Sequence, residues 1–279
     1  MSLLQAVIMG IVQGLSEFLP ISSSAHLVFA SNLYKHFAGI NANIGINQEV
    51  FLDIMLHLGT LIAVLIFFRK EIIEIFKAFY FGIKNKNYTE ENFKIGLYII
   101  IGTILTIVIA YPLSNIAKKL VFMPQLTGIV LAITGILLIS SEWQNKKIQI
   151  KKEINTKSSI FIGIAQGFAS LPGFSRSGLT IATALFMGHE RSKAARYSFL
   201  LSIPVILGAS MIYPLIEIDF SEICTYNWFA IIIGTIVSGV VGYFCIKYFL
   251  KFISKFSLCG FGYYCIIAGI LFAIFFTLE

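Results

Sequence analysis

The chain has 279 residues, of which 57% are hydrophobic and only 13% are charged, and its mean hydropathy is +0.86. Soluble domains carry about 45–50% apolar and about 25% charged residues, so this chain has too little charge to coat a globular surface in water. The composition excludes a soluble enzyme and a disordered chain. A nucleic-acid-binding protein is also excluded despite the net charge of +7, because the Lys and Arg residues are scattered between apolar runs.

Apolar runs of about 20 residues predict helices that span a membrane. In chain order, the uninterrupted runs of sufficient length are Val50–Phe68, Ile95–Ala117, Leu120–Ser141, Tyr197–Ile216, Ile223–Ile246 and Phe256–Leu278. Two further apolar regions, 1–34 and 158–188, contain proline, glycine and polar clusters that interrupt a helix. We therefore predict an all-α, polytopic integral membrane protein with about six full transmembrane helices and two broken or re-entrant helical hairpins.

The loop charges predict how these helices are oriented. If each uninterrupted run crosses once, one face carries 17 Lys and Arg residues, in loops 69–94, 141–157, 189–196 and 247–255, and the other face carries 3. Loops rich in Lys and Arg are typically cytoplasmic, which places both chain ends outside. The number of Lys and Arg residues on each face is the same whether the broken regions are re-entrant hairpins or cross the membrane twice. The charge distribution therefore leaves both arrangements open. We expect residues 69–94 to form an amphipathic surface stretch and His189 to be a solvated loop residue.

The two broken regions resemble each other in sequence. Residues 10–14 (GIVQG) match residues 163–167 (GIAQG), and in both copies a Leu-Pro pair and a serine cluster follow. On the charge topology the two copies enter the membrane from opposite sides. This predicts an inverted repeat, with halves of about 1–140 and 158–279 in one transmembrane domain. Broken helices in such repeats usually meet near the membrane midplane and form the ligand site there.

Ionisable groups are costly inside apolar segments and indicate function. The first broken region contains Glu17, the serines that follow Pro20, and His26; Gln13 lies one helical turn before Glu17. A carboxylate and an imidazole at this spacing are candidates for proton transfer. The alternative is a solvated loop between two short helices.

The second broken region combines glycines, hydroxyls and one arginine between Pro172 and Thr180. Glycine allows backbone N–H groups to approach a ligand, and a helix that starts there directs its positive end at an anion. The planar guanidinium of Arg176 suits phosphate oxygens, and the serine hydroxyls can donate further hydrogen bonds. The alternative is an Arg176–Glu17 ion pair that only ties the halves together, although a phosphate could lie between the two.

Together the two regions predict a phosphate site inside the membrane. Arg176 and the helix-end amides would counter the negative charge, while Glu17 and His26 would transfer protons. A pyrophosphate needs further compensation, which a divalent cation held partly by Glu17 would supply. Because the site lies in the membrane, we expect the substrate to be a phosphate on a lipid tail.

At these residues the chain closely resembles the undecaprenyl pyrophosphate phosphatases of the bacitracin-resistance type. The first family signature, (Glu/Gln)-x-x-x-Glu with Phe-Leu-Pro and Ser-Ser-x-x-His, matches residues 13–26. The second signature, Pro-Gly-x-Ser-Arg-Ser-x-x-Thr, matches residues 172–180 without a mismatch. Weaker family features occur at 51–60 and 195–204, so the resemblance covers essentially the whole chain.

The resemblance implies hydrolysis of undecaprenyl diphosphate to undecaprenyl phosphate, which recycles the lipid carrier for peptidoglycan and other envelope polymers. It also implies resistance to bacitracin, which competes for the same lipid, and dependence on Mg²⁺ or Ca²⁺. The expected location is the bacterial plasma (inner) membrane, with the site open to the extracytoplasmic side. Gln13 departs from those members of the family that carry glutamate at this position. Its carbonyl can coordinate a metal but cannot act as a base, which shifts that duty to Glu17.

The candidate residues fall into three groups. We predict catalytic roles for Glu17, Ser23, His26, Ser175 and Arg176, substrate binding by Gln13, Ser22, Gly173, Ser177 and Thr180, and metal ligation by Glu17 and Gln13. The nucleophile stays open between Ser23, Ser175, His26 and water.

Asp53 and His57 are interpreted as a hydrogen-bonding pair at a helix end and are kept out of the catalytic group. The alternative function is a secondary transporter or lipid flippase, since inverted repeats with broken helices are typical of transporters. The phosphatidic acid phosphatase class ranks low, because its Lys-x6-Arg-Pro and Pro-Ser-Gly-His signatures are absent from the sequence. No nucleic-acid partner is expected, and a homodimer is compatible with the sequence.

Overall fold

The computed structural model describes residues 2–38, 46–121, 123–217 and 223–278. In chain order its elements are α1 (Leu3–Ser16), α2 (Ser23–Ala38), α3 (Ile46–Phe67), α4 (Arg69–Lys84), α5 (Glu91–Val121), α6 (Pro124–Lys147), α7 (Thr156–Phe168), α8 (Arg176–Phe186), α9 (Arg191–Glu217), the 3₁₀ helix η1 (Ile223–Thr225), α10 (Trp228–Ile253) and α11 (Cys259–Leu278). Among the described residues, 6 helices are long and apolar enough to cross a membrane, namely α3, α5, α6, α9, α10 and α11. No strand forms within the described ranges. The prediction of an all-α, multi-pass membrane protein is therefore confirmed.

Each predicted span overlaps one of these helices, but several ends differ. The break between α5 and α6 lies later than expected, and α6 starts at Pro124, since proline is tolerated in the first turn of a helix. Helix α9 starts at Arg191, earlier than expected, and the Glu142 carboxylate anchors this charged residue. Helix α10 starts later, at Trp228, where the Asn227 side chain accepts a hydrogen bond from a first-turn backbone N–H group.

Both broken regions are interrupted as predicted. Residues 17–22 form a turn between α1 and α2, and residues 169–175 form a turn between α7 and α8. Ser22 adopts φ 69° in the first turn, and Gly173 adopts φ 96° in the second. The four short helices have 14, 16, 13 and 11 residues. At 1.5 Å per residue, none of them alone spans a hydrocarbon core of about 30 Å.

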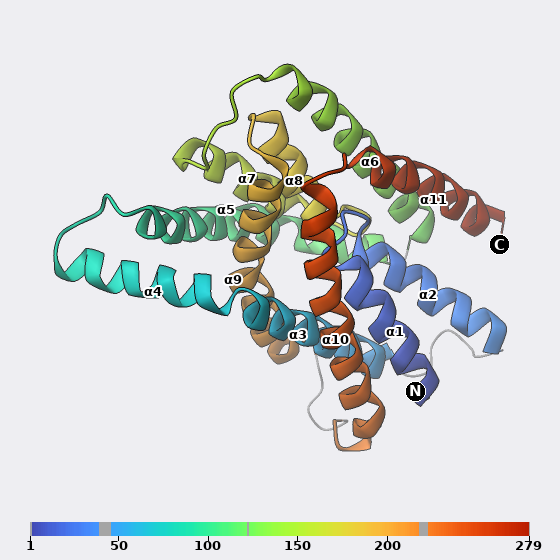
Figure 1. Ribbon diagram of the computed structural model, residues 1–279. Coiled ribbons are helices and arrows are strands. Elements are labelled where there is room, and N and C mark those ends of the chain that lie inside the picture. Colours follow the sequence, from blue (N-terminus) through green and yellow to red (C-terminus); the bar gives the residue numbers. More distant parts are fainter. Residues whose placement is uncertain (1, 39–45, 122, 218–222, 279) are drawn as a thin grey trace.

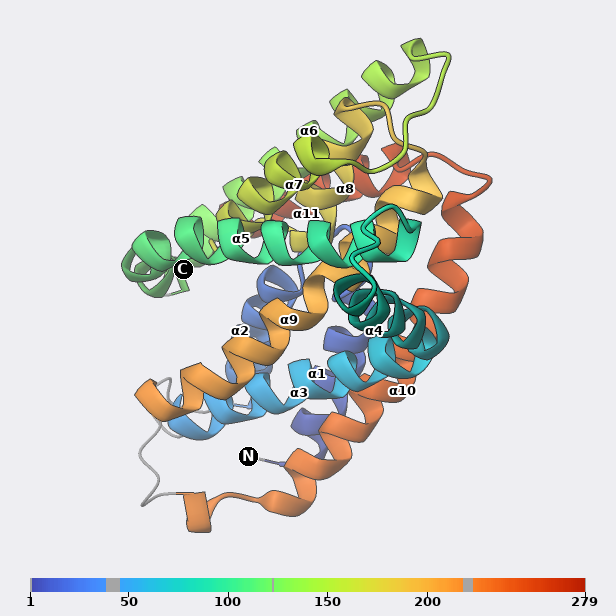
Figure 2. The same cartoon turned by 90° about the vertical axis from the view of Figure 1, so that its left-hand side faces the viewer.

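Each of α1 and α7 packs along a long helix from the other half of the chain. Helix α1 lies beside α10, α7 lies beside α5, and α6 pairs with α11 (Figure 1). The turned view shows α9 beside α3 (Figure 2). Glycine permits the two close contacts: a Cβ on Gly10 would lie 2.5 Å from the Gly234 carbonyl oxygen, and one on Gly163 would lie 2.6 Å from that of Gly102. The relation of the halves as an inverted repeat stays a prediction.

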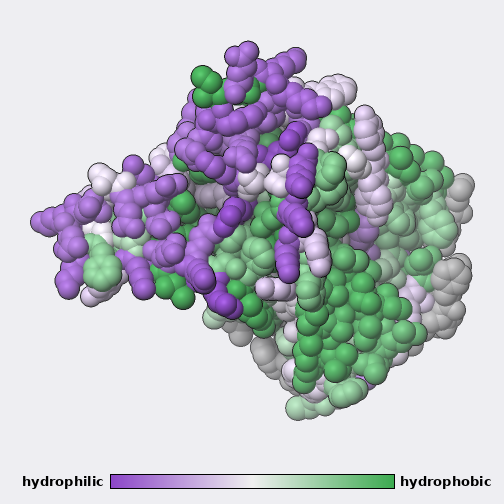
Figure 3. Space-filling view, viewed as in Figure 1, coloured by the Kyte–Doolittle hydropathy of each residue, from purple (hydrophilic) through white to green (hydrophobic). Residues whose placement is uncertain are grey.

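The polar and apolar surfaces are separated. Hydrophilic side chains gather over the α4–α5 hairpin and over the connection between α6 and α7, whereas the surface over α1 and α10 is hydrophobic (Figure 3). The expected surface stretch at 69–94 contains helix α4, whose Phe76 and Tyr80 are exposed. We call the surface formed by residues 69–94, 141–157, 189–196 and 247–255 the lysine-rich face.

The expectation that His189 is solvated is wrong, because this side chain is only 1% exposed. An isolated β-bridge joins it to Lys152 in the α6–α7 connection. The backbone N–H of Lys152 donates to the Gly188 carbonyl at 3.1 Å, and His189 Nδ1 donates to the Lys152 carbonyl at 2.8 Å. The connection therefore covers the imidazole.

Candidate active site

The turns of the two broken regions lie against each other. Ser22 Oγ donates to the Phe174 carbonyl at 3.2 Å, and Ser177 Oγ donates to the Leu19 carbonyl at 3.0 Å. Each broken region thus supplies one hydroxyl to a backbone carbonyl in the turn of the other region. These bonds bring residues separated by 152 and 158 positions in the sequence into one site.

Glu17 is the centre of this site. It caps the C-terminus of α1 and is 6% exposed. Its Oε1 accepts a hydrogen bond from Arg176 Nη2, while its Oε2 accepts from Ser23 Oγ at 2.8 Å and from Gln13 Nε2 at 3.0 Å. The pair with Arg176 joins the two halves, as the sequence allowed. Such a pair depends on both members, because removing one leaves an uncompensated buried charge.

Arg176 has one half of its guanidinium group available for a ligand. It is the first residue of α8, whose N-terminus Ser175 caps by accepting from Gly178 N at 3.0 Å. Nη2 is engaged by Glu17, but Nη1 is buried and has no hydrogen-bond partner among the described residues. A buried unpaired donor on a cation, at the positive end of a helix, is suited to an anionic oxygen.

The imidazole beside Glu17 is His57 of α3, which the sequence interpretation left out of the site. His57 Nε2 lies 3.7 Å from Glu17 Oε2, and its side chain is 28% exposed. His57 Nδ1 bonds the Asp53 carbonyl at 2.8 Å, so Nδ1 carries the proton and the neutral ring has its lone pair on Nε2. Asp53 and His57 were visible as ionisable residues in an apolar span, and that signal could have included them.

His26 lies elsewhere. Its Nδ1 donates to the Ser22 carbonyl at 2.8 Å, and its Nε2 therefore accepts from the Tyr264 hydroxyl at 2.7 Å. The ring stacks on Tyr264, with centroids 5.7 Å apart. The hydrogen-bond partners of His26 are thus Ser22, in the turn before α2, and Tyr264 of α11, and the structure does not bring His26 against Glu17.

The other predicted residues shape the two turns. Ser175 and Ser177 hydroxyls lie 3.2 Å apart, and Ser175 N bonds Thr134 Oγ1 at 3.3 Å. Thr180 Oγ1 donates to the Arg176 carbonyl at 2.8 Å. Gly173 approaches α6 so closely that a Cβ would lie 2.4 Å from the Thr127 carbonyl oxygen. Of the predicted serines, Ser23 is the one whose described contacts include the Glu17 carboxylate.

The donor set for a metal is small. The described residues contain no group of three or more His, Cys, Asp and Glu side chains placed to hold a metal ion. Glu17 offers a carboxylate, and Gln13 Oε1 is buried without a partner among the described residues. Mg²⁺ typically takes one or two protein carboxylates together with waters and substrate phosphates, so these two side chains fit such an ion. Gln166, at the matching position of the second copy, donates from Nε2 to Thr106 Oγ1 at 3.0 Å, and its Oε1 is also buried without a partner among the described residues.

Comparison with known proteins gives a consistent result. The family model described as "Bacitracin resistance protein BacA" matches residues 6–271. The chain is 38% identical to the "Undecaprenyl-diphosphatase" of Methanobrevibacter smithii, over 97% of this chain and 96% of the relative. It is 39% identical to the protein of the same name from Halothermothrix orenii, over 97% of both chains. It is 33% identical to "Undecaprenyl-diphosphatase 1" of Pseudoalteromonas translucida, over 100% of both chains.

Proposed function

The chain belongs to the family of the bacitracin resistance protein BacA, and we propose that it hydrolyses undecaprenyl diphosphate to undecaprenyl phosphate and phosphate. The observation that carries this proposal is the contact of Glu17 with both Ser23 and Arg176. It combines a hydroxyl, a carboxylate able to accept its proton, and a cation with a free donor. Such a group suits transfer of a phosphoryl group.

Arg176 binds the terminal phosphate in this proposal. Nη2 stays on Glu17, and the buried Nη1 donates to a phosphate oxygen. The N-terminus of α8 adds the positive end of its dipole. These groups counter the charge that spreads over the phosphoryl oxygens in the transition state.

Ser23 is the nucleophile in this proposal. Its Oγ attacks the terminal phosphorus and gives its proton to Glu17 Oε2, 2.8 Å away. The bond from that phosphorus to the bridging oxygen breaks, and its electron pair leaves with undecaprenyl phosphate. Water then cleaves the serine phosphate, which releases phosphate and restores the hydroxyl. Ser175 is less suited because it caps α8, and His26 because its Nε2 already accepts from Tyr264.

His57 relays the proton. Its Nε2 lies 3.7 Å from the Glu17 oxygen that Ser23 contacts, and the bond from Nδ1 to the Asp53 carbonyl keeps Nε2 free to accept. Glu17 can pass the proton to this imidazole and return to the ionised form that pairs with Arg176.

A divalent cation, Mg²⁺ or Ca²⁺, would be held by Glu17 and by Gln13 Oε1. When bound, it would counter part of the diphosphate charge that Arg176 leaves uncompensated. The cellular role we propose is recycling of the lipid carrier in the bacterial plasma membrane, with the site open to the extracytoplasmic side. Bacitracin resistance would follow, because bacitracin competes for the same lipid diphosphate.

Phosphate release in detergent tests the proposed function against the transporter alternative. Micelles have no sealed compartments, so transport cannot be measured in them, whereas hydrolysis can. Purified protein with Mg²⁺ is expected to release phosphate from undecaprenyl diphosphate, and a chelator is expected to stop the release. No release in detergent, together with flux of the lipid across the membrane of protein-containing liposomes, would favour a transporter.

A further inference from the structure

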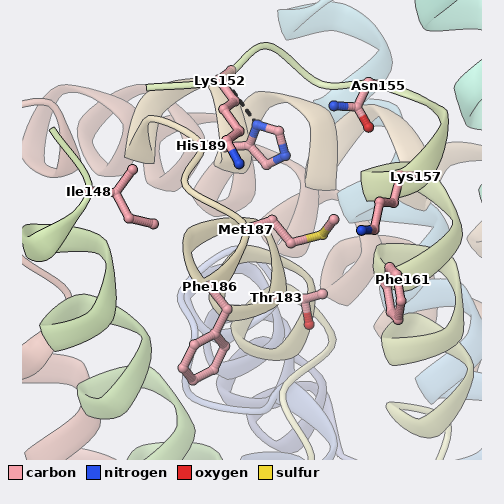
Figure 4. A pocket seen from close by; sticks show the side chains of 9 residues that line it. All are labelled: Ile148, Lys152, Asn155, Lys157, Phe161, Thr183, Phe186, Met187 and His189. Carbon is pink, nitrogen blue, oxygen red and sulfur yellow. Dashed lines mark hydrogen bonds between the residues drawn. The ribbon is translucent and has the colours of Figure 1, made fainter. Parts of the chain in front are cut away.

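A cavity opens on the lysine-rich face, away from Glu17. It has a volume of about 460 Å³ and lies between the N-terminal turn of α7 and the C-terminal turn of α8 (Figure 4). Its lining includes Lys152, Asn155, Lys157, Thr183 and His189. Helix α8 begins at Arg176 and has 11 residues, so its two ends are separated by roughly 16 Å. The cavity is therefore distinct from the candidate active site.

His189 supplies an unpaired acceptor to this cavity. Its Nδ1 donates to the Lys152 carbonyl at 2.8 Å, which leaves the lone pair of the neutral ring on Nε2. Nε2 is buried and has no hydrogen-bond partner in the part of the chain that the structure describes. In Figure 4, the ring nitrogen that is free of the dashed bond faces the space between Met187 and Lys157. Burial lowers the pKa of His189 and so favours the neutral ring, although the hydrogen bond to the Lys152 carbonyl opposes part of this effect.

The charges around the cavity favour an anion. Lys152 and Lys157 both line it. The acid nearest to them in the sequence, Glu153, forms an ion pair with Lys193 instead.

Three carbonyls at or just beyond the C-terminus of α8 accept hydrogen bonds from donors outside the helix. Asn145 Nδ2 donates to the carbonyls of Leu185 at 2.8 Å and His189 at 2.9 Å, and Lys152 N donates to that of Gly188. These donors offset part of the negative charge at the C-terminus of α8.

We propose that this cavity binds a phosphate group that carries a proton, held by Lys152 and Lys157 and sharing that proton with His189 Nε2. A neutral imidazole accepts a hydrogen bond from P–OH, and an imidazolium donates one to P–O⁻. A single proton shared between the ring and the phosphate therefore makes the hydrogen bond, whichever of the two groups carries it. Phosphomonoesters keep such a proton in part near neutral pH, since their second pKa is about 6. Sulfate brings no proton near neutral pH, so its binding requires the imidazole to take a proton from solvent, which burial of His189 opposes. The site therefore favours phosphate over sulfate.

Two sources share this chemistry, inorganic phosphate and the headgroup of a lipid phosphomonoester. Phe161 and Phe186 line the cavity and are 49% and 38% exposed, which leaves an apolar wall for a lipid substituent. The site does not depend on hydrolysis at Glu17, although both products of that proposed reaction belong to this class.

NMR of protein labelled with ¹⁵N-histidine in detergent micelles tests the proposal. The chain has 4 histidines, and the loss of one signal in His189→Asn assigns that residue. Asparagine retains a donor for the Lys152 carbonyl and removes Nε2. Titration with inorganic phosphate at millimolar concentration is expected to shift the His189 signals to saturation, while sulfate does not. Phosphate bound at the candidate active site would instead shift the signals of His57, which lies beside Glu17, so binding at the two sites can be told apart.

Charge variants provide the matched comparison. Lys157→Gln and Lys152→Gln are each expected to weaken phosphate binding at His189 about tenfold. Lys255→Gln removes the same charge from an exposed loop residue outside the cavity and is expected to leave binding unchanged. Tighter binding of dodecyl phosphate than of phosphate identifies a lipid headgroup as the source, and equal binding identifies free phosphate. No shift of His189, an equal response to sulfate, or equal weakening by Lys255→Gln overturns the proposal.

Discussion

Replacing Arg176 with lysine separates its two tasks. The guanidinium pairs with Glu17 through Nη2 and has a second, unpaired donor at Nη1. A lysine ammonium is a compact point charge without the planar fork, so it can compensate Glu17 but cannot also hold phosphate in the same geometry. We therefore expect Arg176→Lys to fold and to lose turnover.

The structure sets the expected size of both effects. Loss of one preorganised donor to a developing anion lowers kcat by about 10²–10³, which is about 2.7–4 kcal/mol. In Arg176→Lys the buried carboxylate of Glu17 still has a cation beside it. Removing one partner of a buried ion pair costs about 3–5 kcal/mol, so we expect the free energy of unfolding of this variant to fall by less than that. Arg176→Ala is expected to abolish turnover and to suffer that larger loss of stability as well.

Arg191→Lys is the matched control. Arg191 holds Glu142 with two hydrogen bonds, from Nε to Oε1 at 2.8 Å and from Nη2 to Oε2 at 2.6 Å, so the same substitution weakens a buried pair that has no part in the proposed chemistry. Phosphate release and thermal unfolding in detergent are measured for both variants. Arg191→Lys is expected to lower the melting temperature with kcat close to that of the wild type. Near-normal kcat in Arg176→Lys would refute the assignment of Nη1 to the phosphate.

Three further changes test other parts of the site. Gly173→Ala is expected to lower the free energy of unfolding by at least about 1–2 kcal/mol, because φ is 96° there and the added Cβ would lie 2.4 Å from the Thr127 carbonyl oxygen; an unchanged melting temperature in detergent would contradict this. Gln13→Glu adds a second carboxylate beside Glu17 and is expected to reduce the Mg²⁺ concentration for half-maximal phosphate release about tenfold, so an unchanged Mg²⁺ requirement argues against metal binding at this position. His57→Gln removes the base 3.7 Å from Glu17 Oε2, and kcat is expected to fall about 10²-fold with little change in KM; activity equal to the wild type would exclude the proton relay.

The membrane-spanning helices and the breaks between the short helices could be predicted from the sequence, because a chain of this composition has to place its long apolar runs in lipid as helices. Apolar length determines the long helices, and Pro20 and Pro172 mark the two turns. The meeting of Glu17 with Arg176 was foreseeable, because a carboxylate and a guanidinium inside the membrane each need a partner.

The partner choices of the three histidines were not foreseeable. His26 follows the serines closely in the sequence, yet its ring turns to Tyr264 of α11, whereas His57 of α3 reaches Glu17 from a distant segment. The burial of His189 depends on the β-bridge to Lys152, which no periodic pattern of apolar residues in the sequence predicts. These arrangements depend on how helices cross in space, and a single sequence does not encode that locally.

Transfer of phosphate to Ser23 tests most directly whether the meeting of the two turns forms a catalytic site. The enzyme is mixed in detergent with undecaprenyl diphosphate labelled on the terminal phosphorus, quenched with acid before steady state, digested and analysed by mass spectrometry. We predict label on the peptide that contains Ser23, with none in Ser23→Ala and much less in Arg176→Lys. Label on Ser175 or His26 instead, or full phosphate release by Ser23→Ala, would contradict this mechanism.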